Sequence, residues 1–350
     1  MKQNRERLLL LVAALMLFTY LSTGSNAFAK AKTSVGAANT EQKPAEIPED
    51  LDQARAALMD LLPQRERFVQ AMKHFHHRQT ALAQQEMRTA RLPETTAEQK
   101  EVLAQQVRRR AALLKELYEE ALKRYDDEAV LHNLYGEILY DYFGDQAGAL
   151  RAWEKALSYK SDLPEPYNNL GLHFFHNGDY EVGLKHMERA LQLSPKNPDF
   201  LYNMAQLYLV HYPQIGKIKG WSKEKIYKEA MKLSKKSATL APEDFELVQD
   251  YAVNFFLAED FGVAPDWKSA AKAWEKARTL ATNNDEQFYT WLNEARVWIR
   301  AKDAAQAERC LREALRLRPD SEIAQRLLRQ VQVGEFDAKQ DKGKRVGGRK

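Results

Sequence analysis

The chain has 350 residues, of which 53 are lysine or arginine and 49 are aspartate or glutamate, so its formal net charge is +4. A charge so close to balance excludes the strongly basic surface that nucleic-acid binding requires. The sequence holds one cysteine, so no disulfide can form within one chain, and we expect the fold to depend on its apolar core.

Residues 1–29 have the pattern of a signal peptide. Three basic side chains precede a short apolar run over residues 8–21, and the small residues Ala27 and Ala29 occupy the two positions that a signal peptidase reads. The apolar run is shorter than the ~20 residues that cross a bilayer. We therefore expect cleavage before Lys30 and an exported protein, periplasmic or secreted. A retained single-span anchor is the alternative.

Two regions of different composition follow the leader. Residues 30–48 are rich in small and polar residues and include two prolines, which is typical of a disordered linker. Residues 49–126 have a helical periodicity, with apolar residues such as Phe68, Met72 and Phe75 at spacings of three and four. This second region is either a degenerate N-terminal cap on the following helices or a coiled-coil arm that forms oligomers.

Three histidines fall in this helical region, at His74, His76 and His77. His74 and His77 are three residues apart and share a helix face, but no third metal ligand stands at a readable spacing. We therefore interpret all three as solvated helix surface. We expect no metal site and no cofactor.

An internal repeat begins near residue 129. Tyr167 and Gly171 are matched by Leu201 and Ala205, each 34 residues further along, and the pentapeptide Ala-Trp-Glu-Lys-Ala occurs both at 152–156 and at 273–277. A small residue such as Gly171 lets two helices approach closely. No unit of this size can bury its apolar face alone, so the units must stack.

This spacing resembles the tetratricopeptide repeat (TPR), which has two antiparallel helices in about 34 residues. The resemblance is to an exported bacterial TPR protein, and it implies an all-α fold. The fold would be a right-handed TPR-type helical solenoid of about five units over residues 129–319, with an N-terminal helical extension. Residues 320–333 are predicted to form the capping helix that solenoids need at an end. Residues 334–350 are predicted to be a disordered basic tail.

Two units carry insertions between their helices, at residues 211–222 and 259–267. The first insertion is more apolar than a spacer requires, since it contains Tyr212, Ile215 and Trp221. Long ordered loops are often functional but are also often packed on their own domain. The first insertion therefore either contacts a partner at the edge of the groove or packs on neighbouring helices.

The inner wall formed by the first helix of each unit carries the candidate binding residues. In the TPR family, the position two places before the helix-opening Gly or Ala faces the concave groove. Stacked amides at this position can donate to and accept from the backbone of an extended peptide. We interpret these amides as exposed, so their removal should change stability by no more than about 0.5 kcal/mol each. The candidate peptide-binding residues are Asn133, Asn168, Asn169, Asn203, Asp250, Asn293, Arg296 and Arg300.

These features favour a non-catalytic TPR scaffold of the cell envelope that binds a protein or peptide. The sequence has no Gly-rich phosphate loop, nucleophile elbow or His-Glu-x-x-His motif, so we expect no enzyme activity. A structural or oligomeric envelope component and an accessory subunit of an envelope enzyme are the alternatives. The partner is not identified by the sequence. We expect no nucleic acid and no membrane span in the mature form, and an oligomer formed through residues 51–125 stays open.

Overall fold

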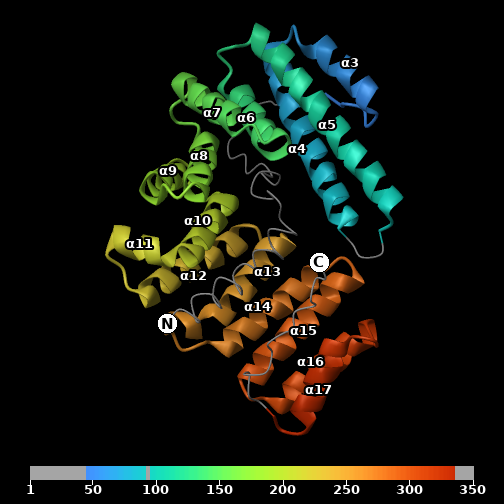
Figure 1. Ribbon diagram of the computed structural model, residues 1–350, viewed down its shortest axis with the longest axis vertical. Helices are drawn as coiled ribbons and strands as arrows, with labels where there is room; N and C mark the ends of the chain where they lie inside the picture. Colours follow the sequence, from blue (N-terminus) through green and yellow to red (C-terminus); the bar gives the residue numbers. More distant parts are fainter. Residues whose placement is uncertain (1–44, 92–94, 336–350) are drawn as a thin grey trace, which may run out of the picture. The chain divides into compact units, whose positions relative to one another are not determined.

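The computed structural model describes residues 45–91 and 95–335, and these residues form α-helices and two short 3-10 turns without any strand (Figure 1). The all-α expectation is confirmed. The predicted signal peptide lies outside the described residues, as do most of the predicted linker and tail. The described helices fall into two compact units, one ending at Val210 and one beginning at His211. No helix in the described ranges is both long and apolar enough to cross a bilayer.

The first unit opens with three helices that share one apolar core. Asp50 caps the first of them through its carboxylate, and Thr96 forms a capping box with Gln99 at the start of the third. The core of these helices continues without interruption into Leu131 and Ile138 of the next helix. The N-terminal helices therefore pack on the first repeat. Their bounds are α3 (Leu51–Leu61), α4 (Arg65–Ala90) and α5 (Ala97–Arg124).

The end of the predicted linker is fixed to α4. Arg78 donates from its two terminal guanidinium nitrogens to the backbone oxygens of Ile47, at 2.9 Å, and Pro48, at 2.7 Å. Ile47 also packs against the core of the first unit. For residues 45–48 the prediction of disorder is wrong, because one apolar side chain and two carbonyls suffice to anchor a segment whose average composition is polar.

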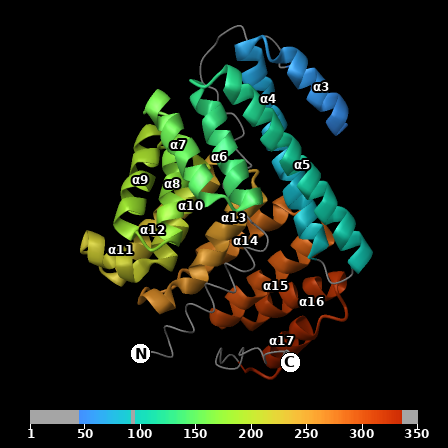
Figure 2. The same cartoon turned by 45° about the horizontal axis from the view of Figure 1, so that its top comes forward.

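Two helical hairpins and a further helix complete the first unit. Gly144 ends the first helix in the left-handed conformation, with φ of 64°, and Asp145 caps the next helix by accepting from the backbone N–H of Gly148. Figure 2 shows these helices side by side, each hairpin against the next. Their bounds are α6 (Ala129–Phe143), α7 (Gln146–Tyr159), α8 (Pro164–His176), α9 (Tyr180–Leu193) and α10 (Pro198–Val210).

Glycines allow the two helices of each hairpin in the first unit to pack closely against each other. A Cβ atom added at Gly136 on α6 would lie 2.5 Å from the indole nitrogen of Trp153 on α7. A Cβ atom added at Gly171 on α8 would lie 2.6 Å from the sulfur of Met187 on α9. The space that each glycine leaves is therefore filled by a buried large side chain of the paired helix, as the repeat spacing predicts.

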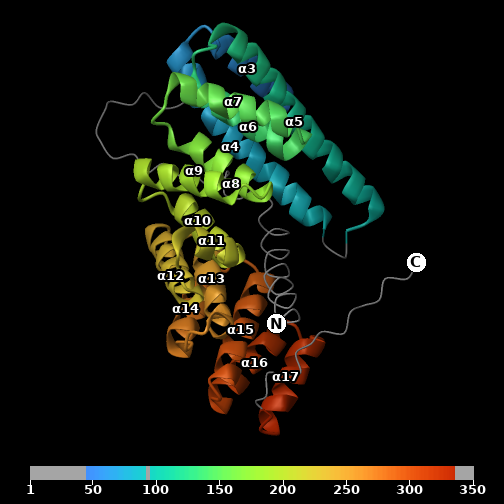
Figure 3. The ribbon, with the colours of Figure 1, turned by 60° about the vertical axis from the view of Figure 1, so that its left-hand side comes forward.

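The second unit continues the pattern of hairpins and ends with the helix α17, in the segment predicted to be a cap (Figure 3). Ser321 caps α17, and Leu327 and Val331 bury one face of it against α15 and α16, so the unit closes with an amphipathic helix. The bounds are α11 (Tyr212–Lys219), α12 (Lys223–Leu240), α13 (Phe245–Asn254), α14 (Trp267–Leu280), α15 (Asn284–Arg300), α16 (Ala304–Leu317) and α17 (Glu322–Gln332).

The two insertions pack on each other in the second unit. The first insertion forms the helix α11, which is capped at its C-terminal end by Gly220. The second insertion contains the 3-10 turn η2 (Glu259–Phe261). Tyr212 meets the buried ring of Phe261 edge-on, with ring centroids 5.1 Å apart, and the ammonium of Lys223 lies over both rings. This geometry supports the self-packed alternative for the first insertion. Contact with a partner stays a prediction.

Candidate functional site

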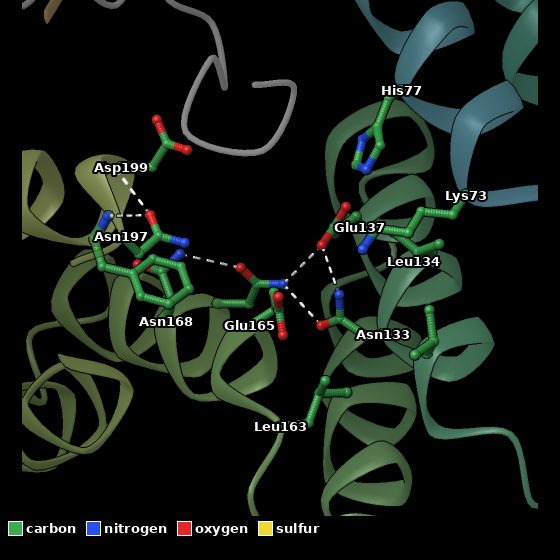
Figure 4. Close-up of a pocket in the computed structure, with 13 residues that line it drawn as sticks. Lys73, His77, Asn133, Leu134, Glu137, Leu163, Glu165, Asn168, Asn197 and Asp199 are labelled. Carbon is green, nitrogen blue, oxygen red and sulfur yellow. Dashed lines mark hydrogen bonds between the residues drawn. The ribbon is translucent and has the colours of Figure 1, made fainter. Parts of the chain in front are cut away.

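A polar recess opens in the first unit where side chains from α4, α6, α8 and the start of α10 converge (Figure 4). Its volume is about 80 Å³, which is room for several water molecules. It brings together three of the four asparagines that the sequence analysis singled out in this unit. The polar residues used below are Lys73, His77, Asn133, Glu137, Glu165, Asn168 and Asn169.

The asparagines of the first unit form one directional hydrogen-bonded chain. Asn203 on α10 donates through Nδ2 to Asn168 Oδ1 at 3.0 Å, and Asn168 donates to Asn169 Oδ1 at 3.3 Å. Asn169 then donates to Asn133 Oδ1 at 3.1 Å and to Glu137 Oε1 at 3.2 Å. Asn133 donates to the same Glu137 oxygen at 2.8 Å. This asparagine chain therefore runs from α10 through α8 to α6 and ends on a carboxyl group.

The interpretation of these amides as exposed is wrong. Asn169 is only 1% exposed, and Asn133, Asn168 and Asn203 are also buried. The position two places before the helix-opening glycine points into the contact between successive first helices, where the amides bond to one another. Their removal should therefore destabilise the fold, because buried polar partners would be left unpaired. Their role in peptide binding stays a prediction.

Glu137, at the end of the asparagine chain, is 5% exposed. Burial raises the pKa of its carboxyl group to about 7, although the amides of Asn169 and Asn133 and the neighbouring His77 oppose this change. Its second oxygen, Oε2, lies 3.3 Å from Nε2 of His76. The carboxyl group is therefore divided between its two protonation states near neutral pH.

The histidines of α4 contradict the expectation of a solvated surface at two of three positions. His74 is exposed, but His76 is 1% exposed and its Nδ1 lies 2.8 Å from the hydroxyl of Tyr118. Burial lowers the pKa of His76 to about 3 and that of His77 to about 4, so both rings are neutral at pH 7. In residues 45–91 and 95–335, no group of three or more His, Cys, Asp or Glu side chains is placed to hold a metal ion.

Several buried polar atoms of residues that line the recess have no hydrogen-bond partner within the part of the chain that the structure describes. These atoms are Glu137 Oε2, Glu165 Oε2 and both ring nitrogens of His77. Burial also raises the pKa of Glu165, in the first turn of α8, although its own backbone N–H opposes this change. Buried polar atoms without partners are uncommon in folded proteins, which suggests that a ligand completes the recess.

Lys73, Glu137 and Glu165 were not predicted from the sequence as site residues, and His77 was predicted to be solvated surface. A signal was available for two of these, because Glu137 is one helical turn after Asn133 and His77 is one turn after Lys73. That α4 lies beside α6 could not be read from the repeat spacing, because α4 precedes the repeats.

In the second unit, Asp250 belongs to a local network. The Asp250 carboxylate accepts from Asn254 Nδ2 at 2.9 Å and from Ser234 Oγ at 3.3 Å. Asn254 also donates to Ser234 at 3.1 Å. These bonds join α12 to α13.

Of the other three candidates of the second unit, Asn293 and Arg296 bond within α15 and Arg300 lies near the second insertion. Asn293 donates to the backbone oxygen of Tyr289 at 2.9 Å and accepts from Arg296 at 3.0 Å. Arg300 lies 3.6 Å from the carboxylate of Glu259 in the second insertion. The eight candidates thus fall into two groups of four, one in each unit, and the four of the first unit are joined in one hydrogen-bonded chain.

A comparison with known protein families identifies one repeat of this chain. The family model described as the tetratricopeptide repeat matches residues 164–197, which hold α8, α9 and the amides Asn168 and Asn169. The chain therefore contains a tetratricopeptide repeat and is a TPR protein in this sense. The resemblance read from the sequence is confirmed in this respect, while export and a bacterial source stay predictions.

Relatives of this TPR protein are distant. It is 31% identical over 75 residues to the Drosophila melanogaster homologue of the BBSome complex member BBS4, which is 21% of this chain and 15% of that protein's length. Among solved structures, the C-terminal part of a TPR repeat-containing protein from Cytophaga hutchinsonii is similar, with 17% identity, coverage of 78% of this chain and 99% of that one, and a TM-score of 0.48. Pseudomonas aeruginosa pilF has 16% identity, coverage of 72% and 99%, and a TM-score of 0.46.

Proposed function

We propose that this TPR protein is a non-catalytic scaffold that binds a protein or peptide, and that the recess of the first unit receives a part of that partner. The observation that carries the proposal is the set of unpartnered polar atoms on Glu137, Glu165 and His77, which face one volume from three helices. Residues on three helices are rigidly positioned relative to one another, which favours specific recognition.

The lining of the recess supports binding rather than chemistry. Side chains of Leu134, Leu163 and Phe200 provide apolar walls beside the polar atoms, a mixture that is typical of sites for side chains of a partner. No serine, threonine or cysteine is among the residues that line the recess, so they supply no hydroxyl or thiol nucleophile beside its carboxyl groups. The thiol of Cys310 is buried in the second unit, and burial raises its pKa to about 12, which keeps it protonated.

Peptide selection tests this function directly. A random peptide library is selected against the full chain, and enriched peptides are titrated by calorimetry. Leu163→Trp would fill part of the recess from its rim, and we expect it to weaken binding about ten-fold or more. The matched control is Val182→Trp, at an exposed valine on α9 that does not line the recess. Equal affinity of both variants would place the binding surface elsewhere on the protein.

We further propose that the protein works in the cell envelope, after export. The support is the sequence of residues 1–29, in which a basic start, a short apolar run and the small residues Ala27 and Ala29 follow the order of a signal peptide. Amino-terminal sequencing of the protein from its producing cell should begin at or near Lys30. Recovery of an intact Met1 on a membrane-bound form would establish an anchor instead.

A further inference from the structure

The two recess glutamates, Glu137 and Glu165, each have one carboxyl oxygen without a hydrogen-bond donor among the described residues. Glu137 is almost fully buried, so bulk water does not solvate this oxygen. The nearby ring of His76, 3.3 Å away, is neutral and supplies no positive charge. An ionised carboxylate in such a position is unfavourable unless a cation joins it.

Two other glutamates, whose side chains are 12% and 5% exposed, are paired with arginines. In the first unit, Glu86 accepts from Arg110 at 2.9 Å. In the second unit, Glu294 binds both Arg278 and Arg309. The recess glutamates differ, because among residues 45–91 and 95–335 no lysine or arginine lies within ion-pair distance of either. The group that would pair with the recess glutamates is therefore a cation, as arginine is at the other two sites.

The remaining charged and titratable groups around the recess leave it acidic. Lys73 of α4 is the one cationic side chain among the lining residues, and His77 beside it is neutral because burial lowers its pKa to about 4. Tyr118 of α5, behind His76, stays protonated because burial raises its pKa. Asp199 of α10 adds a third carboxyl group to the lining. Three carboxyl groups thus face one ammonium group.

We propose that the recess takes a cationic side chain of an extended peptide, either the ammonium of a lysine or the guanidinium of an arginine. This inference rests on the proposed peptide-binding function and names the chemistry that the site selects. Leu134, Leu163 and Phe200 would cover the methylene stem of such a side chain. The charged end would reach Glu137 and Glu165, each of which offers an oxygen that has no donor.

The protonation of the recess glutamates should compete with the binding of a cation. Burial raises the pKa of Glu137 to about 7, so part of the population carries a proton there near neutral pH, and burial also raises the pKa of Glu165. A cation binds the ionised form, and its binding should release protons to the solvent. Affinity should therefore increase from pH 6 to pH 8, whereas burial keeps both histidines neutral over that range.

Peptides that differ at one position test the selectivity of the recess. A host peptide found by the library selection carries lysine, arginine, norleucine or citrulline at its central position, and each version is titrated against the full chain. Norleucine keeps the aliphatic stem of lysine, citrulline keeps the shape of arginine, and both lack the charge. We expect the lysine and arginine versions to bind about 10- to 100-fold more tightly. An acetylated amino terminus on every peptide separates a side-chain ammonium from an α-ammonium.

Variants of the recess locate the effect. Glu165→Gln lies outside the asparagine chain, so it should fold normally and lose most of the preference for lysine, while norleucine binding should stay unchanged. Glu137→Gln keeps an oxygen that can accept from the amides and should have the same effect. Lys73→Met removes a competing ammonium and should tighten lysine binding several-fold. The control is Glu181→Gln, at an exposed glutamate on α9.

The outcomes separate the inference from the function on which it rests. Equal affinity for the lysine and norleucine peptides would overturn the cation preference and leave peptide binding intact. A preference for a glutamate peptide would also overturn it and would assign recognition to Lys73. Library selection that yields no binding peptide at all would overturn both the function and the inference.

Discussion

The two copies of the pentapeptide Ala-Trp-Glu-Lys-Ala have the same helical conformation but different surroundings. In the first unit, the indole nitrogen of Trp153 donates to the backbone oxygen of Asn133 at 3.2 Å, and the ring fills the space beside Gly136. In the second unit, the indole nitrogen of Trp274 is buried without an acceptor in the described residues, and its ring meets Tyr289 edge-on. Five identical residues thus determine a helix and a buried ring, while the neighbouring helix determines the hydrogen bond.

The same contrast extends to the polar interiors of the two units. The asparagine chain of the first unit joins three successive first helices and ends on a carboxyl group that faces the recess. The polar bonds of Asp250 and Asn293 in the second unit stay within a helix or between two adjacent helices. A TPR unit can therefore keep its apolar spacing while its inner polar residues either connect repeats or close locally.

The largest expected difference between the units concerns the central amide of the asparagine chain. Asn169→Ala removes a group that bonds to three neighbours, and it leaves the buried Glu137 with one donor fewer. We expect a loss of about 2–4 kcal/mol in the free energy of unfolding. The matched variant Asn293→Ala should cost about 1 kcal/mol or less, because its bonds are local. Urea denaturation of both variants measures the difference, and equal costs would remove the distinction between the two interiors.

A second expected effect concerns the close approach of α6 and α7. Gly136→Ala would place a methyl group against the rigid indole ring of Trp153, so we expect a loss of about 1–3 kcal/mol. Gly171→Ala places its methyl group against the flexible side chain of Met187, which can rotate away, and it should cost less. Thermal melts of the two variants test this order. The reverse order would mean that α6 and α7 adjust more easily than their packing suggests.

Acid should destabilise the first unit before the second. Seven of the eight histidines precede Val210, and burial lowers the pKa of those with a resolved shift. A folded-state pKa below the unfolded value near 6.5 means that the unfolded chain takes up protons first, so stability is lost as pH falls below about 6.5. The raised pKa of Glu137 has the opposite sign, because its contribution to stability is present at low pH and is lost as pH rises through about 7.

Hydrogen exchange measured at pH 7 and pH 5 can resolve this effect by unit. The histidines outnumber Glu137, so the first unit should lose stability on the order of 1–2 kcal/mol at pH 5 relative to the second. Glu137→Gln removes the opposing contribution and should make the loss larger. Earlier opening of α13 to α17 at pH 5 would contradict the prediction.

The smallest expected difference concerns the paired tryptophans. Trp153→Phe loses a hydrogen bond and leaves the backbone oxygen of Asn133 without that donor, whereas Trp274→Phe removes a nitrogen that has no acceptor. Both variants lose similar apolar area, so Trp153→Phe should cost about 1 kcal/mol more. Urea midpoints of the full chain report the difference. A larger cost at Trp274 would indicate that its nitrogen finds an acceptor in solution.

The sequence predicted the features that depend on local spacing. Gly171 with its helix pair and the helix over residues 322–332 follow from the repeat register, because each is determined by residues close in sequence. The burial of Asn169 could not be predicted this way. Whether an amide faces solvent or the neighbouring repeat depends on how closely successive first helices pack, which no single repeat specifies.

The recess could not be predicted from the sequence for a related reason. Lys73 and His77, which line the recess, belong to a helix that precedes the repeats. An alignment of the repeats therefore cannot place them beside Glu137. The sequence around the three histidines of α4 also gives little information about whether they are buried. Their polar type suggested solvent, whereas the packing of α4 against α5 and α6 encloses two of them.

Because Tyr212 of the first insertion packs on Phe261 of the second, we expect the two insertions to be inherited together. Phe261 is fully buried beneath α11 and α12, and shortening the first insertion to an ordinary repeat turn would uncover its ring. Loss of one insertion in the course of evolution should therefore be accompanied by loss of the other. Among homologous chains we expect to find both segments or neither, and an aromatic residue at position 212 should be exchanged together with the residue at 261.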